Sequence, residues 1–248
     1  GGQGKWEAAK TYYWPIDEKM QFFAYPSSIT DFATEGTAYP TFSFAVNDSP
    51  ASQLDLVVAH HSDVTKPADN GTYTLKFKHI LTRVNFSYKP ENPDYTYAIS
   101  NIEIKGLLGG TAKYTFGVSD GVWNTTNATE DKSYSYSIAA SPEKDGEYYK
   151  LDDTNGSLML LPQAAAGITI EVTYTTKSGE HTFFTGTKAV TLPAETPAWG
   201  IGQNIRYKLT LPVGGDAIDL DTDVNNWNTE DAGNEVTPDT PVTPTPAA

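Results

Sequence analysis

Two segments in the last third of the chain alternate apolar and polar residues with a period of two. Residues 167–176 read GITIEVTYTT, and residues 203–211 read QNIRYKLTL. Because successive side chains of a β-strand point to opposite faces, each segment has one apolar and one polar face. This is typical of antiparallel sheets packed over a core, and no comparable stretch shows the 3.6-residue period of an amphipathic helix. The pattern predicts an all-β protein built as a β-sandwich.

Shorter segments of the same kind recur along the chain, separated by residues that favour turns. Ser178-Gly179 lies between two of them and predicts a hairpin. Thirteen strands are expected, over residues 20–25, 41–46, 54–59, 72–88, 98–105, 112–118, 133–138, 147–151, 157–161, 167–176, 181–185, 187–192 and 203–211. Because thirteen strands exceed what one sandwich of about seven strands holds, we expect two tandem antiparallel β-sandwich domains.

A change of phase in residues 72–88 indicates where the domains divide. Apolar side chains fall at odd positions up to Leu81 and at even positions from Val84 on. A bulge or bend near Thr82 is therefore needed, and a strand that changes its inward face can pass from one core to another. We place the boundary near residues 70–76, with Phe77 and His79 buried at the start of the second domain.

The expected organisation has three parts. Residues 1–74 form an N-terminal β-sandwich domain, residues 75–213 a C-terminal one, and residues 214–248 a C-terminal extension. The first part is short for a complete sandwich, which suggests that strands belonging to it lie upstream. The chain starts Gly1-Gly2-Gln3-Gly4, which reads as a processing or cloning boundary, so any export signal is expected upstream as well.

The C-terminal extension changes character along its length. Apolar residues recur in its first half, at Ile218, Leu220, Val224 and Trp227. After Gly233, proline at nearly every third position forbids helix and favours an extended polyproline conformation. The tail is interpreted either as an extended terminus or as a docking segment.

Composition excludes several classes of function. The formal net charge is −14, so an acidic surface that repels nucleic acid is expected. The sequence has no cysteine, which excludes disulfides, thiolate metal sites and cysteine nucleophiles. No apolar run approaches the roughly 18 residues that a membrane-spanning helix needs.

Histidines and carboxylates offer few candidate metal sites. His60 and His61 would face opposite sides of a strand, so they are unsuited to hold one ion, and His79 shares the inward phase of its segment. Asp219, Asp221 and Asp223, with Glu230 at the twelfth position, imitate a calcium loop. Val224 stands where such a loop needs glycine, and solvated carboxylates on a strand face explain the pattern equally well. We expect no bound metal.

No arrangement of residues indicates catalysis. No serine lies in a nucleophile-elbow pattern, no His-Glu zinc motif occurs, and the pair Asp152-Asp153 lies in a turn-like segment. Tyr12-Tyr13-Trp14-Pro15 and Trp199 could stack on sugars, or they could be buried aromatic anchors. We expect no catalytic residue and no cofactor.

Several segments in a fixed order resemble the fimbrillin-like family of Bacteroidales cell-surface fimbriae, over most of the chain. They are Tyr13-Trp14-Pro15, Phe22-Phe23-Ala24-Tyr25-Pro26, Leu54-Asp55-Leu56-Val57-Val58-Ala59, Phe77-Lys78-His79-Ile80-Leu81-Thr82-Arg83-Val84, Leu160-Leu161-Pro162-Gln163 and Gly202-Gln203-Asn204-Ile205-Arg206-Tyr207-Lys208-Leu209. The resemblance implies two transthyretin-like sandwich domains, export as a lipoprotein to the outer membrane, and polymerisation with other fimbrial subunits by strand exchange. In such an exchange a groove left by a proteolytically removed N-terminal strand accepts a strand from a neighbour.

On this resemblance the donor candidate is residues 217–227, with Ile218, Leu220, Val224 and Trp227 as the side chains that would plug a neighbour's groove. In the free monomer this segment should either fold back on a sheet edge or project away. Shaft, tip and anchor subunits are all compatible with the sequence. The function expected is a structural or adhesive fimbrial subunit, and the alternative is a surface lipoprotein that binds carbohydrate through exposed aromatic residues.

Overall fold

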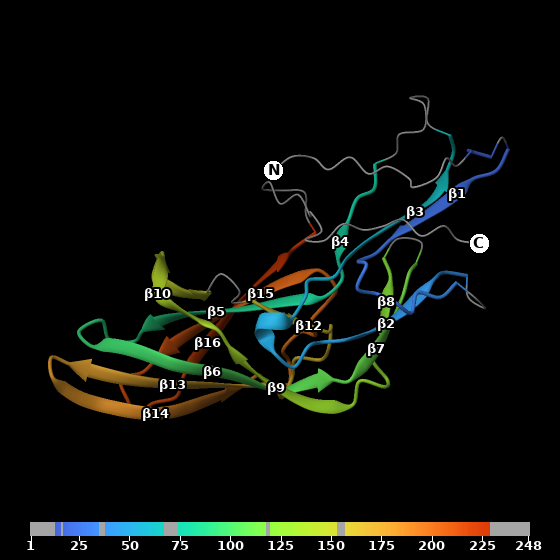
Figure 1. Cartoon of the computed structure of the whole chain (residues 1–248). Coiled ribbons are helices and arrows are strands. Elements are labelled where there is room, and N and C mark those ends of the chain that lie inside the picture. Colours follow the sequence, from blue (N-terminus) through green and yellow to red (C-terminus); the bar gives the residue numbers. More distant parts are fainter. Residues whose placement is uncertain are drawn as a thin grey trace.

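The structure, a computed structural model, describes residues 13–15, 17–34, 38–66, 74–117, 120–152 and 157–228. Within them it contains sixteen strands and one short 3-10 turn, η1 (Pro50–Ser52), so the predicted all-β class is confirmed (Figure 1). The strands are β1 (Met20–Ala24), β2 (Thr41–Ala45), β3 (Val57–Val64), β4 (Lys78–His79), β5 (Thr82–Pro90), β6 (Thr96–Gly109), β7 (Thr111–Thr115), β8 (Val122–Asn124), β9 (Glu130–Tyr136), β10 (Ile138–Asp145), β11 (Tyr148–Asp152), β12 (Leu158–Leu160), β13 (Thr169–Ser178), β14 (His181–Thr191), β15 (Gln203–Leu211) and β16 (Asp219–Asn226).

Two sheets form the larger sandwich. One has the order β10-β11-β5-β15-β16, with β12 also paired to β5, and the other has the order β14-β13-β6-β9. The two alternating segments, β13 and β15, lie in different sheets and turn their apolar faces to a common core. The β15–β5 pair is parallel, which corrects the expectation of purely antiparallel sheets. The hairpin at Ser178-Gly179 is confirmed, because β13 and β14 pair antiparallel across it.

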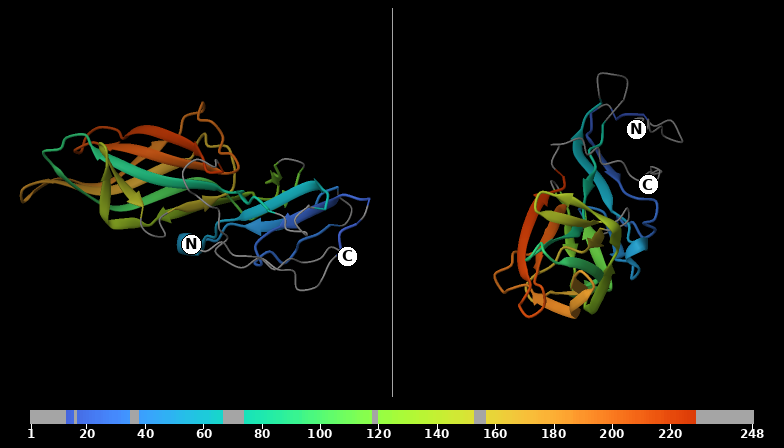
Figure 2. Two further views of the ribbon diagram at one scale, coloured as in Figure 1. Left: turned by 90° about the horizontal axis from the view of Figure 1, so that it is seen from above. Right: turned by 90° about the vertical axis from the view of Figure 1, so that its left-hand side faces the viewer.

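Two three-stranded sheets form the smaller sandwich, in the orders β1-β3-β4 and β2-β7-β8. Its core contains Phe42, Leu56, Ile80, Leu81 and Tyr114. Figure 2 shows the two sandwiches placed end to end, which makes the molecule elongated.

The chain crosses between the two cores more than once. β4 and β5 are separated by Ile80 and Leu81; Leu81 belongs to the smaller core and Val84 to the larger, so the bend expected near Thr82 is confirmed. His79 is buried, at 6% exposure, but on β4 of the smaller sandwich and not at the start of the second domain as expected. Phe77, which was also expected to be buried, is only half-buried.

A second crossing was not expected. β6 of the larger sandwich continues across Gly110, which has a φ of +92°, into β7, which pairs with β2 of the smaller one. Residues 111–116 therefore pack in the smaller core, although the sequence analysis assigned all of 75–213 to one domain. The boundary near residues 70–76, of which 70–73 lie outside the described residues, stays a prediction, as does the transthyretin-like topology.

Candidate functional site

The described part of the C-terminal extension, residues 214–228, folds back on its own fold, one of the two states expected of the segment up to Trp227. β16 pairs antiparallel with β15 along its whole length, from Gln203↔Asn226 to Thr210↔Asp219. It is the outermost strand of its sheet, and no other described strand pairs with its free side. An outer strand of this kind presents unpaired backbone groups to any incoming chain.

The four candidate plugs occupy three different environments. Ile218 is 5% exposed and belongs to the larger core, and Leu220 is half-buried against that core. Val224 is 52% exposed. Trp227 lies beyond β16 and packs against the smaller sandwich through His79. The structure therefore does not bring the four together on one apolar stripe, and their role as plugs stays a proposal.

The turn that leads into β16 is fastened to the opposite sheet. Three side chains of β13 and β14 donate hydrogen bonds to its carbonyl oxygens: Tyr174 to Pro212 at 2.9 Å, Thr176 to Val213 at 2.6 Å, and Lys188 to Asp216 at 2.7 Å. The first two bonds satisfy backbone acceptors that would otherwise lack a partner near the core, whereas the third lies at the exposed end of the turn. Residues 212–216 thus form a strap that bridges the two sheets before β16 begins.

The outer face of β16 carries three carboxylates, one of which pairs with a lysine of β15. Asp219, Asp221 and Asp223 share this face, and Asp223 lies 2.5 Å from the Lys208 ammonium, which raises the pKa of Lys208. The three carboxylates follow the spacing of a strand, not of a calcium loop, and Glu230 lies outside the described residues. Cross-strand pairs of opposite charge favour the observed register.

Two residues before Lys208 on β15, Arg206 forms the least exposed ion pair within the described residues of this sheet. Its guanidinium donates to both carboxylate oxygens of Asp152, at 3.0 and 2.5 Å, and to Ser87 Oγ at 3.0 Å. Tyr136 donates a further hydrogen bond to Asp152 at 2.8 Å, while burial raises the pKa of the Tyr136 phenol strongly. Asp152 is therefore a structural carboxylate, consistent with the absence of a catalytic motif in the sequence. Asp153 lies outside the described residues.

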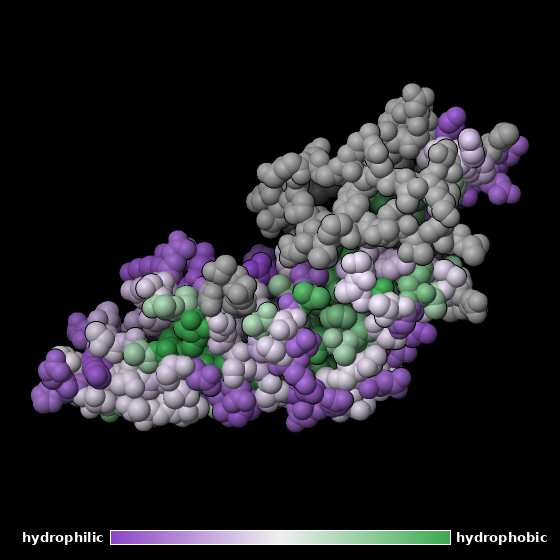
Figure 3. Space-filling model, in the orientation of Figure 1, coloured by the Kyte–Doolittle hydropathy of each residue, from purple (hydrophilic) through white to green (hydrophobic). Residues whose placement is uncertain are grey.

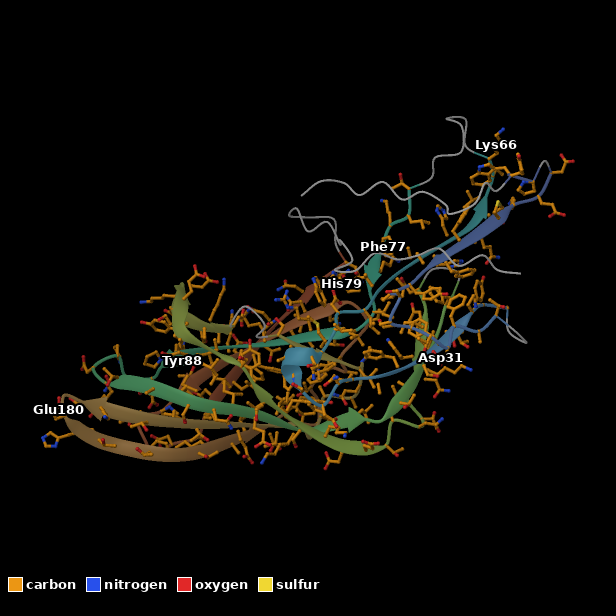
Figure 4. The ribbon with its side chains drawn as sticks, viewed as in Figure 1. Asp31, Lys66, Phe77, His79, Tyr88 and Glu180 are labelled. Carbon is orange, nitrogen blue, oxygen red and sulfur yellow. The ribbon has the colours of Figure 1, made fainter. Side chains whose placement is uncertain are left out.

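The end of the extension contacts the smaller sandwich. The indole ring of Trp227 stacks on the imidazole of His79, with ring centroids 3.5 Å apart. Nδ1 of His79 lies 2.7 Å from Asp55 Oδ2. The side chain of Asn228 forms two hydrogen bonds with the backbone of His79. Figure 4 shows His79 at the junction of the sandwiches, far from Glu180 at the other end of the larger one.

A groove opens beside this contact, between the two sheets of the smaller sandwich. It encloses about 260 Å³ and is lined by apolar side chains, among them Val58, Ile80, Tyr114 and Phe116, with Lys76 and Lys78 at one side. Burial raises the pKa of the Tyr114 phenol to about 12. Figure 3 shows that apolar residues on the visible surface gather in part where the two sandwiches adjoin.

The remaining histidines and aromatic residues are placed as follows. On β3, His60 stacks on Phe23 at 4.5 Å while His61 is exposed, so the two rings face different sides as expected. Burial lowers the pKa of His60. Trp199 is buried and donates to the Tyr207 hydroxyl at 3.0 Å, so it is an anchor of the core, not a sugar platform. Tyr13 is 87% exposed, and Tyr12 lies outside the described residues.

Sequence reasoning missed two residues of this site. Asp55 was quoted only within a strand motif, and Asn228 was not singled out at all. An isolated Asp or Asn after an apolar segment carries no pattern of its own, because its partner is the backbone or side chain of a residue remote in sequence. The only available signal was the inward phase of His79, which implied that a buried imidazole needed partners.

Comparisons with known proteins give consistent results. A family model described as fimbrillin-like matches residues 1–227. The fimbrium subunit Fim1C of Phocaeicola vulgatus is 32% identical over an alignment of 104 residues, and the match covers 35% of this chain. That match spans only about a quarter (27%) of the relative's length.

Solved structures show the same fold. A fimbrial protein from Bacteroides vulgatus superposes with a TM-score of 0.67 at 21% identity, covering 87% of this chain and 80% of that one. A candidate cell adhesion protein from Bacteroides uniformis superposes with a TM-score of 0.56 at 18% identity, covering 88% of this chain and 77% of that one.

Within the described residues, no helix is long and apolar enough to cross a bilayer.

Proposed function

Since this chain belongs to the fimbrillin-like family, we propose that it is a structural or adhesive subunit of cell-surface fimbriae, exported as a lipoprotein to the outer membrane and assembled with other fimbrial subunits by strand exchange. The donor in this proposal is β16 with the residues that flank it. The acceptor is the groove of the smaller sandwich of a neighbouring subunit.

One observation carries the proposal. The same molecule has an outermost strand with apolar residues on one face and, in its smaller sandwich, an apolar groove beside a sheet edge. Addition of an extended strand to such an edge gains main-chain hydrogen bonds, and apolar side chains entering the groove add selectivity. Shaft, tip and anchor positions in the fimbria are all compatible with this arrangement.

Electron microscopy of the purified protein, with and without substitutions on β16, tests the proposal. Leu220→Asp combined with Val224→Asp should leave the monomer folded, because neither side chain is fully buried, and should abolish filaments. Ile218 is left unchanged because it is buried in its own core.

Thr185→Asp with Thr187→Asp, on the outer face of β14, is the matched control and should still give filaments. Filaments from the β16 variant would contradict β16 as the donor. Absence of filaments from the unsubstituted protein under every assembly condition would contradict a shaft role.

A second candidate function is carbohydrate binding at the surface. Tyr13 is 87% exposed and adjoins Trp14, which packs edge-to-face against Phe22 at 5.7 Å. The exposed Tyr13 ring, next to a Trp14 ring that Phe22 holds in place, is suited to stack on a sugar. A glycan array distinguishes this function from a purely structural one: binding that Tyr13→Ala removes would support it, and a blank array would contradict it.

A further inference from the structure

We infer that Asn228 and Trp227 cap the free edge of β4, so that a strand from a second copy of this chain can add to β4 only by releasing the end of β16. This inference rests on the strand exchange proposed above. It adds that acceptance of a donor and release of the subunit's own donor are coupled through one contact at His79.

The backbone of His79 points towards the free edge of its sheet. Ile80 N–H donates to Leu56 O at 3.0 Å, on the side of β3. Because neighbouring residues of a strand direct their backbone groups to opposite sides, the N–H and C=O of His79 point away from β3. Among the described residues, no strand other than β3 pairs with β4. This is the position at which an added strand would form its hydrogen bonds.

The side chain of Asn228 occupies that position. Its Oδ1 accepts from the His79 N–H at 2.7 Å, and its Nδ2 donates to the His79 carbonyl oxygen at 3.1 Å. One amide group thus forms the donor and acceptor pair that a neighbouring strand would otherwise supply. An incoming strand cannot bond to His79 while Asn228 remains there.

Three further contacts hold this cap in place. The Trp227 ring stacks on the His79 ring, and the Trp227 N–H donates to Gly202 O at 2.7 Å. Gly202 has a φ of +65°, and a Cβ there would collide with the Asn228 amide. The Asp55 carboxylate, beside Nδ1 at the edge of the imidazole ring, fixes the orientation of that ring. The end of β16 is therefore bound to the edge strand of the other sandwich.

The occupant that fits this edge is β16 of a second copy. The groove beside β4 is apolar at Val58 and Ile80. Its charged lining comprises Lys76, Lys78 and Asp120, and the Lys78 ammonium lies 2.6 Å from the Asp120 carboxylate. β16 presents Leu220 on one face and a row of three aspartates on the other, so an added β16 would exchange Asp120 for its own carboxylates at Lys78. The segment that already bonds to His79 within the chain is the direct continuation of β16.

The consequence is an ordered assembly. In a free monomer β16 is paired with β15, and the two residues that follow it occupy the acceptor edge, which limits spontaneous polymerisation. Once a strand is accepted at β4, the end of β16 is freed and becomes available to the next subunit. By linkage, whatever loosens the cap must also favour acceptance.

The first test uses hydrogen exchange of the monomer. Asn228→Ala should raise the exchange rate of the β16 amides near Val224 to Asn226 roughly tenfold, the effect expected from losing two hydrogen bonds. Exchange in β13 should be unchanged. Asn225→Ala, an exposed neighbour on the same strand, is the matched control and should have no such effect. Unchanged protection of β16 in Asn228→Ala would overturn the inference, whether or not the protein forms filaments.

The second test uses a synthetic peptide of residues 216–228 added to the unsubstituted monomer. The peptide should further protect the amide of His79, whose N–H points to the free edge, and, at the same time, speed exchange in the protein's own β16. Protection at His79 with β16 unchanged would overturn the coupling and leave strand exchange standing. Protection confined to β15 would show that the peptide replaces β16 in its own position, which would also overturn the inference. No binding, together with no filaments, would refute the proposed function itself.

Discussion

Because β16 docks on its own fold, the loss of unfolding free energy on truncation to alanine should decrease from Ile218 through Leu220 to Val224. Ile218→Ala removes three carbon atoms from a side chain that is 5% exposed in the larger core. At about 0.8 kcal/mol per buried carbon the transfer loss is roughly 2.4 kcal/mol, and the cavity left behind brings the total to about 3–4 kcal/mol. Leu220→Ala, at a half-buried position, should cost about 1–2 kcal/mol, and Val224→Ala, which is 52% exposed, less than about 0.5 kcal/mol.

Urea denaturation of the monomer, followed by circular dichroism, measures these three free energies. The order Ile218, Leu220, Val224 is the result that the structure predicts. A negligible effect of Ile218→Ala would mean that the segment before β16 does not belong to the core. Equal effects at all three positions would refute the reasoning that burial decreases along the strand away from the strap.

Three further predictions follow from single contacts. Asp152→Ala should lower the unfolding free energy by about 3 kcal/mol, because it leaves the partly buried Arg206 without its carboxylate. Asp223→Ala, which removes the more exposed partner of Lys208, should lower it by less than about 1 kcal/mol. Equal losses in urea titrations would contradict this difference. Burial raises the pKa of Tyr207 to about 12, and the unfolded phenol ionises first, so the contribution of Tyr207 to the stability is complete below pH 10 and falls by about 1.4 kcal/mol per pH unit as the pH rises from about 10 to 12. Other buried phenols, such as Tyr114, add to this alkaline loss; Tyr207→Phe should make it shallower by that share, and an unchanged slope would count against the reasoning. Tyr174→Phe, which removes the hydrogen bond from the strap, should cost about 1 kcal/mol in the same assay, and no loss would show that the strap is held by its other contacts.

The local pattern of the sequence predicted the strands well but not how they combine. β13 and β15 were evident because one face of each is buried and one is solvated, which gives strict alternation. The parallel pairing of β15 with β5 joins residues more than a hundred positions apart, and nothing in either strand indicates the direction of its partner. The phase change at Thr82 located one crossing between the cores.

The other crossing lacked such a signal. β6 and β7 are separated by Gly110 alone, so the chain reads as one interrupted strand while its two halves belong to different sandwiches. Of the site, sequence reasoning predicted the extension, its apolar residues and its folding back as one of two states. It did not predict the Asn228 cap, because a single amide that bonds to a distant backbone leaves no periodicity to detect.

The central claim, that β16 is handed from one subunit to the groove beside β4 of the next, is tested most directly by carbodiimide cross-linking of filaments grown from equal amounts of ¹⁴N- and ¹⁵N-labelled protein. The reagent joins carboxylates to ammonium groups in contact, and mixed-isotope peptides identify links between different chains. The account predicts mixed-isotope links from Asp219, Asp221 or Asp223 to Lys76 or Lys78. Filaments in which these carboxylates are joined only to Lys208 of the same chain would contradict it.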